Sequence, residues 1–139
     1  MKGTSISALA LAVTLVASTA LAEEPHHATA KLEPVGDSHV TGVVNITAMP
    51  GGGTMINIVA RGLDSGTEYL SLYYENGTCQ LEPYSEDDVI ARYTPNPGGV
   101  ATVNVKSEED FDEIHSISVR VADGFALKSC ASFGEEEKK

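Results

Sequence analysis

The stretch "VTGVVNITAMPGGGTMINIVAR", Val40–Arg61, holds two alternating segments around a turn, and it decides the fold class. In the first segment the apolar residues Val44 and Ile46 alternate with polar ones, and in the second Ile56 and Ile58 do the same. Successive side chains of a strand point to opposite faces, so a period of two is typical of a half-buried β-strand. The intervening "PGGG" supplies turn conformations. The stretch therefore predicts two consecutive strands.

About eight such segments recur along the chain. Besides the two in the quoted stretch, they are residues 28–34, 68–74, 89–93, 100–105, 115–121 and 128–132. Clusters of Gly, Pro, Asn and Asp separate several of them, at 50–53, 62–66, 95–99 and 122–124. Short strands with such turns are typical of an all-β sandwich or barrel. The charged segment 107–114 is expected to be a connection with room for one helical turn.

The alternation also assigns the faces of two of these strands, each expected to be half-buried. In residues 68–74 one face carries Leu70, Leu72 and Tyr74 and the other carries Tyr69, Ser71 and Tyr73. In residues 115–121 one face carries Ile117, Val119 and Val121 and the other carries Ser116, Ser118 and Arg120.

The N-terminal segment has the pattern of a secretory signal peptide. Residues 1–22 contain one lysine near the start, a short apolar run and a closing "ALA". The run is shorter than the roughly 20 residues of a membrane span, so we expect cleavage and no span afterwards; a buried helix or an uncleaved anchor is the alternative. We therefore divide the chain into a signal peptide (1–22), a flexible leader (23–27), one β-barrel domain (28–134) and a disordered charged tail (135–139). The protein is expected to be exported, to a periplasm or outside the cell.

The chain is strongly acidic, with 20 Asp and Glu against 9 Lys and Arg and a formal net charge of −11. Such a surface repels phosphate backbones, which argues against nucleic-acid binding. The acidic clusters at 86–88 and 108–113 lack the spacing of a calcium loop and are better explained as solvated connections. No nucleophile elbow, P-loop or dinucleotide fingerprint is present, so no catalytic residue is predicted.

The chain has two cysteines, Cys79 and Cys130. In an exported chain they most simply form one disulfide, because an oxidising compartment permits it and no other thiol competes. There is no C-x-x-C pair, so a dithiol redox motif is not supported.

Four passages, in this order, resemble the copper/zinc superoxide dismutase family, whose fold is a Greek-key β-barrel of eight antiparallel strands. "ATAKLEPVGDSHVTGVVNIT" (28–47) is similar to the family's first hairpin, and "IVARGLDSG" (58–66) to its I-x-G-L-x-P-G passage. "PNPGGVATVNV" (95–105) is similar to D-K-D-G-V-A-D-V, and "ISVRVADG" with "LKSCASFG" (117–134) to the closing segment with its cysteine. The resemblance implies the same fold, and it also places the two cysteines where the family has a disulfide.

The family's copper ligands are not matched. Its H-G-F-H-x-H motif falls on "EYLSLY" (68–73), which puts Ser71 and Tyr73 at two copper positions. The last copper histidine falls at about Val121. Because imidazole ligands hold the redox copper in that family, the resemblance implies the scaffold without the dismutase activity, and no cofactor is expected.

Two further family features are missing. The segment 80–93, where the family carries its bridging and zinc histidines, contains no histidine, and only Asp88 lies near the position of the zinc aspartate. The arginine that guides the anionic substrate in the family falls at Leu127. A chain of this net charge therefore lacks the positive funnel that attracts a small anion.

The four histidines, His26, His27, His39 and His115, are the remaining metal candidates. Each is more simply a leader or strand-end residue, and nothing in their spacing unites them into a zinc site. They define an alternative hypothesis, a divergent copper- or zinc-binding protein with residual dismutase or metal-handling activity.

Tyr69, Ser71 and Tyr73 share one face of their predicted strand and are the candidate binding patch. The alternative for the tyrosines is cross-strand pairing on the outer surface of the barrel.

The leading hypothesis is an exported, dismutase-like β-barrel with a structural or binding role, no catalytic activity and an unknown protein or small-molecule partner. A generic β-sandwich adhesion or binding module, with the family likeness accidental, is a further reading. A disulfide from the end of a loop to the last strand fits the dismutase topology.

Overall fold

In residues 26–81 and 88–134, which the structure describes, the fold is built from eight β-strands and a short 3-10 turn. The structure is a computed structural model. The strands are β1 (His27–Pro34), β2 (Thr41–Ala48), β3 (Thr54–Arg61), β4 (Tyr69–Tyr74), β5 (Val89–Tyr93), β6 (Ala101–Ser107), β7 (Ser116–Val121) and β8 (Leu127–Ser132), and the turn is Phe111–Glu113. Within those two ranges, no helix is long and apolar enough to cross a membrane. The expected signal peptide, most of the expected leader and the expected tail lie outside the described residues.

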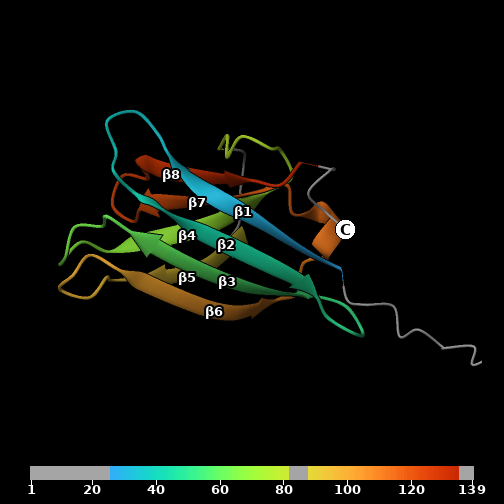
Figure 1. The fold of residues 1–139 in the computed structure, drawn as a ribbon. Helices are drawn as coiled ribbons and strands as arrows, with labels where there is room; N and C mark the ends of the chain where they lie inside the picture. Colours follow the sequence, from blue (N-terminus) through green and yellow to red (C-terminus); the bar gives the residue numbers. More distant parts are fainter. Residues whose placement is uncertain (1–25, 82–87, 135–139) are drawn as a thin grey trace, which may run out of the picture.

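The eight strands form one antiparallel sheet that closes almost completely into a barrel. Their order is β5-β4-β7-β8-β1-β2-β3-β6. Figure 1 shows β1, β2, β3 and β6 on the near side and β8, β7, β4 and β5 behind them. Strands β4, β5 and β6 follow one another, and β7 returns to pair with the other side of β4, which is a Greek-key arrangement. The expected all-β Greek-key barrel of about eight antiparallel strands is confirmed.

The first and last strands pair, and this pairing joins the two halves of the sheet. Leu32 on β1 lies opposite Ala131 on β8, and Glu33 lies opposite Cys130. The two edges of the sheet are β5 and β6, which contact each other although no hydrogen-bond ladder joins them in the described chain. We call the line between β5 and β6 the seam.

The stretch Val40–Arg61 forms a hairpin, β2 and β3, in the barrel wall. Val44 lies opposite Ile58 and Ile46 lies opposite Ile56, and all four side chains are fully buried. Each buried aliphatic side chain of this size contributes about 1.5–3 kcal/mol to stability. The predicted alternation is confirmed for both strands.

The barrel begins earlier than the sequence suggested. His27 is the first residue of β1 and pairs with Thr47, and the carbonyl of His26 accepts a hydrogen bond from the Ala48 N–H at 2.8 Å. The end of β2 has backbone groups that need partners, and these two residues supply them. His26 and His27 therefore belong to the barrel and not to a flexible leader.

Strands β4 and β7 are buried on both faces, so the expectation that they are half-buried is wrong. In β7 the predicted apolar face, Ile117, Val119 and Val121, packs in the barrel core as expected. In β4 the assignment is reversed, because Tyr69 and Tyr73 face the core and the apolar residues face outward. Their outer faces are also buried, although Ser116, Ser118 and Arg120 on β7 have the spacing of a solvent-facing row. The reason is that the loop after β4 and the turn before β8 cover these two strands.

Gly42 on β2 offers a test of how closely β2 packs against β3. It has a φ of 150°, and an added Cβ atom would lie 1.9 Å from the carbonyl oxygen of Val59 on β3. We expect Gly42→Ala to lower the free energy of unfolding by about 2 kcal/mol more than Gly36→Ala, measured by urea denaturation. Gly36 is a matched control because its φ is also positive, at 62°, but its Cβ would meet no atom within 4 Å. Equal losses for the two variants would contradict this account.

Candidate functional site

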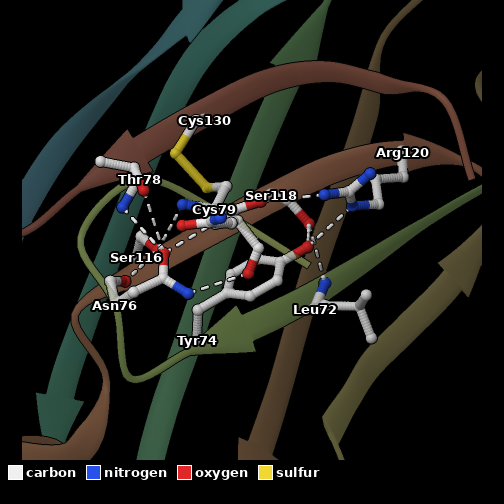
Figure 2. Close-up of a disulfide and its surroundings, with 10 residues drawn as sticks. Leu72, Tyr74, Asn76, Thr78, Cys79, Ser116, Ser118, Arg120 and Cys130 are labelled. Atoms are coloured by element: carbon white, nitrogen blue, oxygen red, sulfur yellow. Dashed lines mark hydrogen bonds between the residues drawn. A yellow bond between two sulfur atoms is a disulfide. The ribbon is translucent and has the colours of Figure 1, made fainter. Parts of the chain in front are cut away.

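The structure contains the disulfide between Cys79 and Cys130, which confirms the expected pairing. Cys79 lies in the loop that follows β4, and Cys130 lies on β8. The bridge holds this loop against the outer face of the barrel (Figure 2). There Leu70, Leu72 and Tyr74 of β4 pack with Cys79 in a second apolar cluster, separate from the barrel core.

Arg120 lies at the centre of this covered face and is only 7% exposed. Its Nε donates to the hydroxyl of Tyr74 at 2.8 Å, Nη2 donates to the carbonyl of Cys79 at 2.9 Å, and Nη1 donates to the carbonyl of Phe125 at 2.7 Å. The guanidinium also lies 5.9 Å from the centre of the Tyr74 ring. All three acceptors are neutral, so this buried charge is stabilised by dipoles.

Arg120 binds two residues that have an unusual backbone. Among the non-glycine residues that the structure describes, Cys79 and Phe125 are those with a positive φ, at 57° and 62°. Such conformations cost of order 1–3 kcal/mol and persist where the surroundings fix them. The two carbonyls that Arg120 binds belong to these same residues. One side chain therefore fixes both the loop after β4 and the turn before β8.

Of the two serines on this face of β7, Ser116 binds the same loop and Ser118 binds strand β4. Ser116 Oγ accepts from the Cys79 N–H at 3.0 Å and donates to the Asn76 carbonyl at 2.6 Å. Ser118 Oγ lies 2.8 Å from the Tyr74 hydroxyl (Figure 2). These partners are a phenol and backbone groups, so the geometry provides neither serine with a general base. We assign both serines a positioning role.

This cluster is not among the features predicted from the sequence. Its signal is the Ser-x-Ser-x-Arg pattern of residues 116–120, which alone is indistinguishable from a solvated strand face. Leu127, the position that the resemblance gives to the family's guiding arginine, lies opposite Arg120 on the neighbouring strand. An arginine is thus present beside that position, on β7.

We expect Arg120→Lys to lower the free energy of unfolding by about 2–4 kcal/mol, because a single ammonium cannot satisfy all three acceptors. Urea denaturation measures this loss, and hydrogen exchange measures the expected faster opening of the Cys79 amide. Arg61→Lys is the control, since Arg61 is exposed on β3 and its replacement should change stability by less than about 0.5 kcal/mol. If the two variants are equally stable, Arg120 does not fix the loop.

The predicted patch of Tyr69, Ser71 and Tyr73 does not form an exposed surface. Tyr69 and Ser71 are buried in the barrel. The Tyr69 hydroxyl accepts the Asp64 N–H at 2.9 Å, and Ser71 Oγ lies 2.7 Å from the hydroxyl of Tyr93 on β5. The alternative of outer-surface pairing is also wrong for Tyr69, since its ring stacks on Tyr93 inside the barrel, 6.4 Å between centroids.

Tyr73 differs from its two neighbours because it is only partly buried and its hydroxyl meets carboxylates. Burial raises the pKa of Tyr73 strongly, and hydrogen bonds to Glu109 and Asp88 raise it further. The pKa of Glu113 is also raised, first by a hydrogen bond to Glu109, then by desolvation and by the repulsion of the acidic groups around it. Tyr73 therefore remains a neutral phenol among carboxylates.

A cleft of about 370 Å³ opens in the seam, between the start of β5 and the end of β6. Val89 and Ile90 of β5 and Val105 of β6 give it apolar walls, and Lys106, Glu108 and Glu109 add charged groups. Glu109 links the cleft to Tyr73, because it lines the cleft and bonds the Tyr73 hydroxyl. The cleft is thus of mixed character, with three apolar and four polar lining residues and a group of perturbed pKa beside it, and it is a candidate ligand site.

The four histidines are not gathered into a ligand set. His26 and His27 lie at the start of β1, where the His26 ring is 6.1 Å from that of Phe111, and His39 precedes β2. His115 precedes β7, and its backbone bonds Tyr74 of β4 and Phe133, the residue that follows β8. Nowhere in residues 26–81 and 88–134 are three or more His, Cys, Asp or Glu side chains arranged to hold a metal ion.

The buried tyrosines make stability depend on alkaline pH. Burial raises the pKa of Tyr93 to about 12, whereas an unfolded tyrosine titrates near 10. Above pH 10 the unfolded state loses its proton first, so stability falls as pH rises. We expect Tyr93→Phe to remove about 1 kcal/mol of the loss between about pH 9 and 11, measured by urea denaturation at each pH. Ser71→Ala keeps the Tyr93 phenol, so its free energy of unfolding should fall with pH by the full amount. If the free energy of unfolding falls equally with pH in wild type and Tyr93→Phe, Tyr93 is not the group responsible.

No family model matches the chain, and no curated protein matches it.

Proposed function

We propose that this chain is an exported β-barrel protein with a binding role and no catalytic activity, related in scaffold to the copper/zinc superoxide dismutases. Two features support the relationship. The barrel has eight antiparallel strands in Greek-key order. The disulfide joins the loop after β4 to the last strand, which is the position that fits the dismutase topology.

The observation that carries the non-catalytic reading is the environment of the positions matched to copper ligands. Ser71 is fully buried and bonded to Tyr93, and Val121 packs against the barrel core. Tyr73 also packs against the core, and its hydroxyl bonds carboxylates. These three side chains stabilise the barrel, and redox copper chemistry needs ligands of a different type.

Export is supported by the sequence of residues 1–22 and by the disulfide, because such bonds persist mainly in oxidising compartments. A binding role is supported by the cleft at the seam and by the position of Tyr73 beside it. Of the residues in the predicted patch, Tyr73 is thus the one retained in the proposal.

Metal loading tests the proposal directly. The purified protein, loaded with copper and zinc and then desalted, should retain well below one metal ion per chain and should not accelerate superoxide decay. Metal content is measured by mass spectrometry and the decay by stopped-flow absorbance. Tight one-to-one copper together with dismutase activity would overturn the proposal.

Histidine variants separate weak surface binding from a built site. The variants replace His26 and His27 together, His39, or His115 by alanine. Whatever residual metal each variant retains, none should show dismutase activity. If one replacement abolishes both metal and activity, the metal-handling alternative holds instead.

A further inference from the structure

The seam between β5 and β6 is closed at one end and open at the other. The two strands are consecutive and are joined by a tight turn, in which the Asn96 N–H donates to the Val100 carbonyl and the Gly99 N–H donates to the Asn96 carbonyl, both at 2.9 Å. The cleft lies at the opposite end, between the start of β5 and the end of β6. The two strands are thus joined by the turn at one end, and the cleft lies between them at the other.

Strands β5 and β6 present two free sheet edges. In an antiparallel strand, alternate residues direct their N–H and C=O groups to each side, so a strand with one neighbour leaves half of them unpaired. Strand β5 has only β4 as a ladder neighbour, and β6 has only β3. Free edges of this kind are templates for an added strand.

Strand β6 is the better template of the two. Its ladder with β3 runs from Ala101 to Ser107 without a shift in register. The ladder of β5 with β4 shifts between Ser71 and Leu72, and such irregularities make an edge less suited to pairing.

The charges at the open end favour a basic partner. Glu108 and Glu109 line the cleft together with one base, Lys106. Asp88 joins Glu109 at the Tyr73 hydroxyl, and Glu113 bonds Glu109 from outside the cleft. The chain as a whole carries a net charge of −11, so a second copy or an acidic segment is repelled from this end.

We propose that the open end of the seam binds an extended, basic peptide segment of a partner protein, which adds as a strand to the free edge of β6. The half-buried walls of Val89, Ile90 and Val105 receive its apolar side chains, and a Lys or Arg reaches Glu109 and Asp88. Because side chains of a strand alternate between its two faces, a bound strand can place apolar side chains on one face and basic ones on the other. This inference rests on the proposed binding role and is independent of the metal chemistry.

Three synthetic peptides test the inference on the full mature protein: acetyl-Lys-Val-Thr-Val-Lys-amide, its counterpart with Glu at both ends, and the basic peptide with its central Thr replaced by Pro. The basic peptide should bind saturably and shift the NMR amide signals of residues 89–91 and 103–107. The acidic peptide should bind about tenfold more weakly or worse. The proline peptide should bind more weakly because it lacks one backbone donor.

A matched pair of variants locates the charge contact. Glu109→Gln should weaken binding of the basic peptide by about threefold or more, whereas Glu33→Gln removes the same charge from exposed β1 and should have little effect. The inference is overturned if the two variants have equal effects, or if the peptide does not bind saturably at millimolar concentration. It is also overturned if the amide shifts lie outside the seam, or if the seam signals shift only with protein concentration. The metal and superoxide assays do not involve the peptide, so a failure here is distinguishable from a failure of the non-catalytic assignment.

Discussion

The guanidinium of Arg120 is the contact on which the covered half of the barrel depends. It binds Tyr74 on β4, the loop carbonyl of Cys79 and the turn carbonyl of Phe125. A disulfide stabilises mainly by restricting the unfolded chain, whereas a planar fork of donors fixes the direction of each acceptor it binds. The bridge to Cys130 thus keeps the loop near β8, and Arg120 sets the backbone conformation of the loop. Together they give β4 and β7 a second buried face.

Most of the fold could be predicted because its strands combine strict alternation with turn residues between them. Strands β3 and β5 have the predicted bounds, and the other strands differ by one or two residues at their ends. The β2–β3 register is well determined, since a slip of one residue would turn Val44 and Ile46 to solvent. The 3-10 turn Phe111–Glu113 lies in the connection where one helical turn was expected.

The candidate site could not be predicted in the same way, because alternation does not reveal what covers a strand. Ser116, Ser118 and Arg120 have the spacing of a solvated face, but a loop and a turn from elsewhere in the sequence cover them. Ser71 illustrates the converse case. Its hydroxyl suggests a surface position, yet it is buried because Tyr93, more than 20 residues away, supplies a partner. Both outcomes depend on contacts that only the closed barrel creates.

The pairing of β1 with β8 sets the stage of folding at which the barrel can close. Leu32 and Ala131 are partners in a ladder that joins the two halves of the sheet, and almost the whole domain lies between them in sequence. Such distant pairings form slowly, because a long loop must close before the contacts are gained. Because synthesis proceeds from the N-terminus, β8 is the last strand to be made. Neither this ladder nor the Cys79–Cys130 bridge can form before β8 is present, so both the barrel and its covering loop are completed late.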